Sequence, residues 1–310
     1  MGLIFCGFMA YFLDRKIQVD NRKYHEEGKR VATLAISSGC FGFSNRLARK
    51  VARDATRELG TSVGVEVVVP RWGLNLTKSL AVSAHYPLQF DCKEKLGERT
   101  YWALLHGGPQ KNPTHKVGLP IVVHAPTIKY LVGELGEDGF YKRFGNTTIW
   151  LENAESDDPQ TDPIGNVIDA VEILKSLGMT AGVCYDVGHA ATHALSTDRW
   201  RPDRNDRFIC QMAVDLGRMS ALTISAAHIH DVGLLGQDHR PLYFGFLSPW
   251  LVAHTLVQRN PNIQLTLEAN YVGRYTKMVA MRIFGCGYRK AEERAICDLA
   301  LLKDVIDRTS

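Results

Sequence analysis

LPIVVH, residues 119–124, is a short apolar run that ends in a metal-ligand residue, and the same pattern recurs along the chain. An ionisable side chain at the end of a buried strand costs free energy unless something pairs it. The other runs of this kind are LAVSAH (80–85), TTIWLE (147–152), AGVCYD (181–186), ISAAHIHD (224–231) and IQLTLE (263–268). We interpret the repeated ending as convergence of these strand ends on metal.

Strand-like runs alternate with helical patterns, which is typical of repeated βα units and a parallel sheet. Their continuous apolar character suits strands that are buried on both faces. The candidate strands are 31–37, 63–69, 79–85, 119–124, 147–152, 181–186, 223–230 and 263–268. The sequence therefore predicts an α/β fold, a single-domain (β/α)8 TIM barrel over residues 30–310. Barrel enzymes carry their sites at the C-terminal ends of the strands, where the candidate ligands fall.

Several helices have recognisable ends. Ser44 can cap a helix that runs to Leu59, with Gly60 as its stop signal. The pair Asp162-Pro163 opens another helix that closes at Gly178. A last helix over about 289–307 is expected to complete the ring.

The composition fits one large globular enzyme. The chain has 310 residues, of which 45% are hydrophobic, so it can bury a sizeable core. Its formal net charge of +4 tolerates a polyanionic partner without requiring one. The 7 cysteines include no CxxC pair, which favours a reducing compartment, and we expect a cytoplasmic protein.

The most apolar stretch is MGLIFCGFMAYFL, residues 1–13. It is shorter than the roughly 20 apolar residues that span a bilayer, so no stable membrane insertion is expected. Neither a basic region before it nor a cleavage site after it indicates a signal peptide. We expect residues 1–29 to form an N-terminal extension packed on the barrel.

The strand ends and a nearby loop offer imidazole and carboxylate groups, which suit zinc, manganese or iron. One ion could be held by His85, His124 and Glu152. Glu152 would bridge to a second ion, and the other ligands of that ion would be Asp186, His228 and Glu268. A third ion could be held by His189 and His239.

The ordered series of these motifs resembles the xylose isomerase-like barrel superfamily, and within it most resembles endonuclease IV, a metal-dependent abasic-site nuclease. The motifs are SAHYP (83–87), VVHAP (122–126), WLENAES (150–156), CYDVGHA (184–190), HIHD (228–231), DHRPL (238–242) and LEAN (267–270). The resemblance covers roughly residues 30–270. It implies up to three Zn²⁺ ions, ligated by His85, His124, Glu152, Asp186, His189, His228, His239 and Glu268.

Parts of the family pattern are altered: the first strand lacks its Gly-x-His, Tyr243-Phe244-Gly245 replaces a Gly-Glu-Gly, and the loop at the third ion differs. The nuclease has Asp-x-His at the third ion, whereas here Gln237 stands two residues before His239 and Asp238 is adjacent to it. Either Asp238 reaches the metal from a shifted loop, or the third site is weakened or empty. We interpret Asp231 as a metal ligand or a group that orients His228, and His230 as structural.

The leading hypothesis is a phosphodiester hydrolase acting on DNA with abasic sites, in which Glu152 and Glu268 are the catalytic residues. The alternative is a sugar or sugar-phosphate isomerase or epimerase that binds one Mn²⁺ or Mg²⁺ and a small sugar. A third hypothesis is that the protein is not an enzyme and that its barrel keeps a metal site for binding or stability alone. The basic helix over 46–57 favours a nucleic acid only weakly, because charge-rich helices are usually solvated faces.

Overall fold

The computed structural model describes residues 32–42, 44–68, 80–86, 119–154, 160–195, 203–233, 239–242, 247–272 and 288–309. The chain divides into the units Met1–Arg30 and Val31–Ser310. The extension expected over residues 1–29 lies outside the described residues, as do Gln237 and Asp238.

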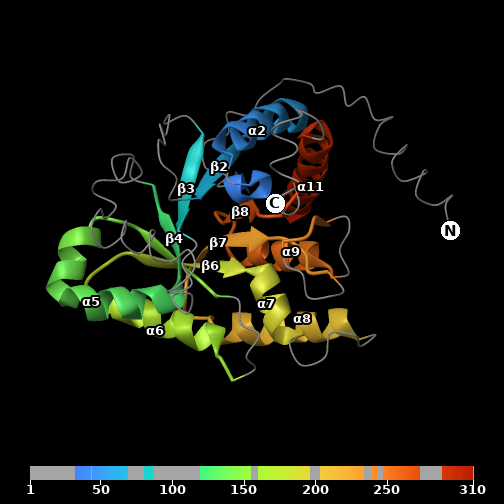
Figure 1. Ribbon diagram of the computed structural model, residues 1–310. Helices are drawn as coiled ribbons and strands as arrows, with labels where there is room; N and C mark the ends of the chain where they lie inside the picture. The colour runs from blue at the N-terminus through green and yellow to red at the C-terminus, as the bar shows by residue number, and fades with distance from the viewer. Residues whose placement is uncertain are drawn as a thin grey trace. The chain divides into compact units, whose positions relative to one another are not determined.

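Parallel strands close into one barrel, in which each strand pairs with the next and β1 pairs with β8 (Figure 1). Each strand of the described residues lies within two residues of its predicted range. The strands are β1 (Thr33–Ser37), β2 (Val63–Val68), β3 (Ala81–Tyr86), β4 (Ile121–His124), β5 (Ile149–Glu152), β6 (Ala181–Asp186), β7 (Ile224–Ile229) and β8 (Gln264–Leu267). The predicted (β/α)8 TIM barrel is confirmed.

Burial explains why these runs form strands. Every residue of β2 is buried, as expected for a strand covered on both faces. β2 also approaches β3 closely at Gly64, where an added Cβ would lie 2.4 Å from Cγ1 of Val82. Only glycine fits this contact between neighbouring strands.

The predicted helix ends are also confirmed. Helix α2 (Asn45–Leu59) begins after Ser44, whose hydroxyl accepts a hydrogen bond from the amide of Leu47, and ends at Gly60 with a left-handed φ of 66°. Helix α6 (Pro163–Ser176) begins after Asp162, and α11 (Tyr288–Thr309) is the last helix.

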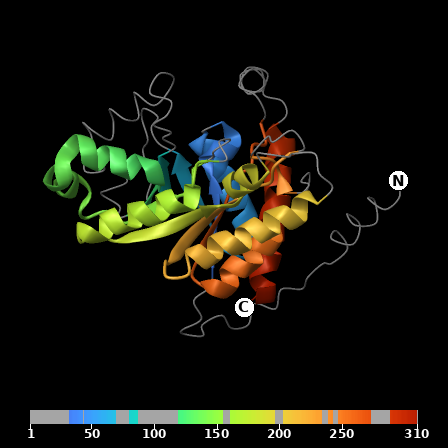
Figure 2. The same ribbon diagram turned by 90° about the horizontal axis from the view of Figure 1, so that it is seen from below.

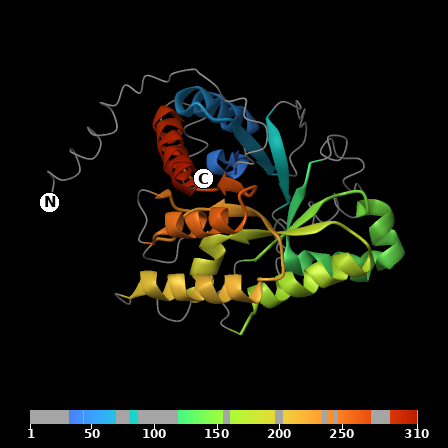
Figure 3. The same ribbon diagram turned by 180° about the vertical axis from the view of Figure 1, so that it is seen from behind.

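The remaining helices complete the outer ring. Helices α5 and α6 lie side by side (Figure 2), and α11 lies between α2 and α9 (Figure 3). No helix within the described ranges is long and apolar enough to cross a membrane. These helices are α5 (Ala125–Phe144), α7 (Val187–Ala194), α8 (Arg204–Arg218) and α9 (Pro249–Arg259), and a 3-10 turn, η1 (Ser38–Phe41), follows β1.

A small apolar cluster underlies the strand ends. It consists of Val122, Cys184 and Ala226, with Trp150 packed against them. Each of these residues stands two positions before a candidate ligand on the same strand, so each lies on the same face as that ligand and deeper in the barrel. On the side of β4 to β7 the candidate site therefore has an apolar floor.

Candidate metal centre

The structure brings together the eight side chains that the resemblance implies as metal ligands. Each belongs to a group whose ligand atoms lie within 4.8 Å of one another, and all but the half-buried His239 are buried. The groups are His85, His124 and Glu152; Glu152, Asp186, His228 and Glu268; His189, His230 and His239; and Glu66, His85, His228 and Glu268.

Strand register causes this convergence. His124 pairs directly with Glu152 across β4 and β5, and Asp186 pairs with His228 across β6 and β7. Because these residues end neighbouring parallel strands at the same level, their side chains meet at one mouth of the barrel.

Glu152 lies at the centre of the site, and its two carboxylate oxygens face different groups. Oε2 lies 2.9 Å from Nε2 of His85 and 3.4 Å from Nε2 of His124. Oε1 lies 3.1 Å from Nδ1 of His228. One carboxylate thus reaches the first and the second group at once, as a bridging ligand would.

Carboxylates surround one nitrogen of His228. Besides Glu152, its Nδ1 lies 2.8 Å from Oε2 of Glu268 and 3.5 Å from Oδ2 of Asp186. The Asp186 carboxylate also caps α7 by accepting a 2.6 Å hydrogen bond from the amide of His189. This cap fixes the first turn of α7, which carries His189.

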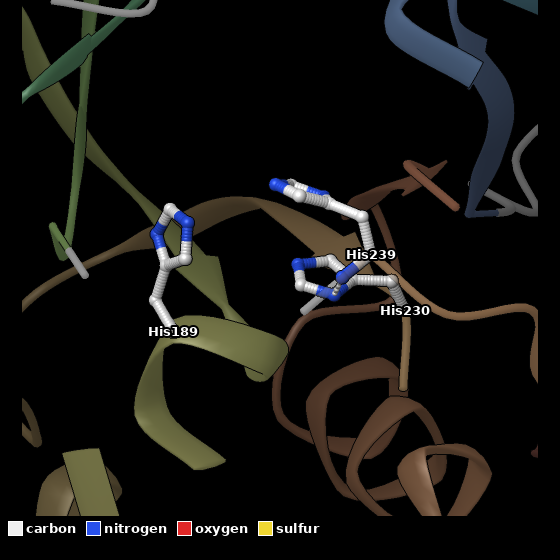
Figure 4. Close-up of side chains that lie close together, drawn as sticks. All are labelled: His189, His230 and His239. Atoms are coloured by element: carbon white, nitrogen blue, oxygen red, sulfur yellow. Dashed lines mark hydrogen bonds between the residues drawn. The ribbon is translucent and has the colours of Figure 1, made fainter. Parts of the chain in front are cut away.

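The third group consists of three imidazoles (Figure 4). His189 faces the other two, and the rings of His230 and His239 stack with their centroids 4.3 Å apart. Nδ1 of His189 lies 2.9 Å from the carbonyl of Asn153, and Nδ1 of His239 lies 3.0 Å from the carbonyl of Glu268. Since a carbonyl only accepts, both rings carry their hydrogen on Nδ1 and keep the Nε2 lone pair for a cation.

His230 has the opposite arrangement. Its Nδ1 accepts a 2.9 Å hydrogen bond from the amide of His239, so its hydrogen is on Nε2. That Nε2 lies 3.1 Å from Oδ1 of Asp186. In this arrangement His230 donates to Asp186 and offers no lone pair to a cation, although it lies within ligand distance of the other two imidazoles.

The backbone at His239 is in the left-handed region, with φ 51°. Non-glycine residues adopt this conformation at a cost, and such residues cluster at functional sites. Its neighbour Arg240 exchanges two backbone hydrogen bonds with Asp231, and the amide of Asn270 donates to the carbonyl of His239. These bonds hold the loop and direct His239 toward His189.

The buried histidines and carboxylates shift one another's pKa values. Burial opposes protonation of His85, but Glu152 and Glu268 outweigh it and raise the pKa of His85 to about 10. At His228, too, neighbouring groups outweigh burial and raise the pKa. At Glu152 and Glu268 the nearby histidines outweigh burial and lower the pKa of each carboxyl. Without a cation, therefore, protons on the histidines balance the carboxylates.

The donor set fits a divalent metal. Among the described residues, both ring nitrogens of His85, Oε2 of Glu152 and Oε2 of Glu268 are buried without a hydrogen-bond partner. Orphaned buried polar atoms are costly, and here they are nitrogen and oxygen atoms that zinc or manganese would satisfy.

His230, which we expect to be structural, faces Asp186 and supports the site without offering a lone pair. One residue of the site escaped the sequence analysis. Glu66 is buried beside His228, and the signal was a carboxylate inside an otherwise apolar strand.

The sequence leaves open whether Asp231 and Asp238 bind metal, and the structure describes only Asp231. Asp231 belongs to none of the metal groups of the described residues, and its Oδ1 accepts a hydrogen bond from the amide of Val232. Its burial raises the pKa of Asp231 to about 7. Asp238 lies outside the described residues.

No protein-family model matches the sequence, and no curated protein matches it. The structure is similar to the crystal structure of a xylose isomerase domain containing protein from Salmonella typhimurium LT2. The TM-score is 0.51 at 11% identity, over 88% of this chain and 97% of that chain. D-threo-3-hydroxyaspartate dehydratase from Delftia sp. HT23 gives a TM-score of 0.40 at 12% identity, over 85% of this chain and 59% of that chain, too low to bear on the fold. The fold is thus a TIM barrel like that of the Salmonella protein.

Proposed function

We propose that this protein is a metal-dependent phosphodiester hydrolase that cleaves DNA at abasic sites. The position of Glu152 carries the proposal, because its two oxygens face two separate groups of ligand-type side chains. A carboxylate that bridges two cations about 3.5–4 Å apart is a common feature of enzymes that hydrolyse phosphate esters.

Each part of the centre has a role in this proposal. Bound cations would supply a hydroxide near neutral pH and would offset the charge on the attacking and leaving oxygens. Glu268 is only 7% exposed, and its ionised carboxylate would orient the attacking water and take its proton. His189 and His239 would bind a third cation through Nε2.

The choice of DNA as substrate rests on the ordered series of motifs and on the metal groups. Helix α2 adds little, although it is rich in basic residues. Lys50 lies 3.0 Å from Asp54 and 2.6 Å from Glu292, and Arg57 also pairs with Asp54. These pairs neutralise part of the basic face.

A sugar or sugar-phosphate isomerase or epimerase is the second candidate. The group of Glu152, Asp186, His228 and Glu268 could bind a single Mn²⁺ or Mg²⁺ by itself, and its two glutamates could move a proton between adjacent carbons of a sugar. The similarity to a protein named for its xylose isomerase domain supports this alternative.

Metal content separates the candidates. Elemental analysis of protein purified without a chelator should give close to three equivalents of metal per chain, mainly zinc, if the hydrolase proposal holds. One equivalent of manganese or magnesium would favour the isomerase instead. No metal, and no uptake on reconstitution, would overturn both.

Cleavage assays then test the reaction itself. We expect the zinc-loaded protein to cut a duplex that contains one abasic site and to leave the same duplex with an intact base uncut. Glu268→Gln should abolish cleavage while the fold, followed by circular dichroism, survives. Full activity of this variant would reject the assigned role of Glu268 under either candidate function.

A further inference from the structure

A carboxylate outside the predicted ligand set lies against the central ligand histidine. Glu66 of β2 is completely buried, and its Oε1 is 2.9 Å from Nε2 of His228. Its other oxygen, Oε2, accepts a 2.9 Å hydrogen bond from the hydroxyl of Ser83. The side-chain amide of Gln264 in turn donates to that hydroxyl at 2.8 Å. A buried carboxylate with a single neutral donor is costly, so Glu66 needs a second donor.

His228 is the residue that can supply it. Its Nδ1 faces Glu152 and Glu268, and this is the nitrogen that points to the proposed cations. A neutral imidazole that binds a cation through Nδ1 carries its hydrogen on Nε2. The carboxylate at Nε2 is that of Glu66.

Two other ligand histidines of the centre, His189 and His239, have the same kind of support. His189 and His239 each give the hydrogen of the non-ligating nitrogen to a backbone carbonyl. At His228 a carboxylate takes the place of the carbonyl, and a charged acceptor increases the basicity of the imidazole toward a metal.

We infer that Glu66 is a positioning residue of the metal centre, which keeps the hydrogen of His228 on Nε2 and directs Nδ1 to the cation. The inference rests on the proposed metal centre. The two facing atoms are at ion-pair distance but lack hydrogen-bond alignment, so the ring must turn slightly when Nε2 donates.

Direct ligation by Glu66 is disfavoured by the chemistry of imidazole. An ion held by Glu66 would need Nε2 of His228 and would also recruit Nδ1 of His85, which lies 3.7 Å from Oε1 of Glu66. The other nitrogens of these rings face Glu152. A neutral imidazole has one lone pair in the ring plane, so it cannot serve both places.

The test compares Glu66→Gln, Glu66→Ala and Ser83→Ala with the wild-type chain. Glu293→Gln serves as the matched control, because it makes the same change at an exposed pair with Arg289 on α11. Three quantities are measured on the full chain: zinc equivalents at saturation, zinc affinity by competition with a chelator, and the tautomer of His228 by ¹⁵N-histidine NMR.

Glu66→Ala should weaken zinc binding about 10- to 100-fold, while the number of equivalents at saturation stays as in wild type. Glu66→Gln keeps an acceptor oxygen and should lose less, and Ser83→Ala should lose least. The NMR signal of His228 should show a mixture of tautomers in Glu66→Ala. If that variant fails to fold, the near-isosteric Glu66→Gln and the distal Ser83→Ala still test the role.

Two results would overturn the inference. Unchanged affinity and an unchanged His228 tautomer in all Glu66 variants would make Glu66 a structural carboxylate. Loss of a whole zinc equivalent at saturation would make it a ligand. A wild-type chain that takes up no metal would overturn the proposed function itself, and so the failures of the two proposals can be told apart.

Discussion

Metal uptake at this centre should depend steeply on pH, because its histidines hold protons when no cation is bound. Burial opposes the charge of His85, but Glu152 and Glu268 raise its pKa to about 10. A metal ion requires the neutral imidazole, so binding near neutral pH must displace this proton.

The size of the effect follows from that pKa. Each displaced proton makes the apparent affinity rise about tenfold per pH unit below the pKa. From about pH 6.5 to about pH 8.5 the dissociation constant of zinc should therefore fall at least about 100-fold. The raised pKa values of His189 and His228 can only steepen this slope.

Stability of the metal-stripped protein should change in the opposite direction. A pKa raised from 6.5 to about 10 means that His85 contributes stability that is complete below pH 6.5 and is lost as the pH rises toward 10. Metal-stripped protein should thus become less stable over the same range in which zinc binding strengthens.

Competition with a chelator at several pH values measures the slope, after correction for protonation of the chelator. Calorimetry in two buffers of different ionisation enthalpy counts the protons released. His254→Gln, on α9 and outside the metal groups, should leave the slope unchanged. A zinc affinity that does not vary with pH, or heats that do not depend on the buffer, would refute the reasoning.

Three further predictions concern single residues. Glu152→Ala should release the cations of both groups that it joins, and elemental analysis at wild-type stoichiometry would contradict its bridging role. Gly188→Ala puts a Cβ 1.8 Å from Cε1 of His230 and should cost about 1–3 kcal/mol in chemical denaturation, whereas Gly217→Ala meets nothing within 4 Å and should not destabilise. Burial raises the pKa of Asp231 from 3.8 to about 7, so its contribution to stability is lost as the pH rises through that range. Asp231→Asn should remove this loss in thermal denaturation, and an unchanged pH profile would speak against it.

The barrel could be predicted from the sequence because each strand repeats the same local pattern. A buried parallel strand must be apolar along its length, and in β4, β5 and β6 this run ends abruptly in His124, Glu152 or Asp186. Helix α2 could also be predicted from the sequence, since Ser44 and Gly60 mark its two ends. These signals are local, and nearby residues suffice to interpret them.

The remaining parts of the site depend on contacts between distant residues. Glu66 accepts a hydrogen bond from the hydroxyl of Ser83. That hydroxyl in turn accepts a hydrogen bond from the side-chain amide of Gln264, 181 residues further along the chain. No local sequence pattern predicts these two hydrogen bonds. The direction of His239 depends on a left-handed backbone at a residue that seldom adopts it, and only the surrounding hydrogen bonds make it possible.

The pairing of β1 with β8 has a consequence for how the protein is made on the ribosome. Until the segment around Gln264–Leu267 has been synthesised, β1 and β7 each have an unpaired edge. Such an edge can pair with another chain and cause aggregation. The same segment delivers Glu268, so the nascent chain carries histidines and carboxylates that cannot yet form the complete centre. Closure of the barrel and completion of the candidate ligand set are therefore one late event.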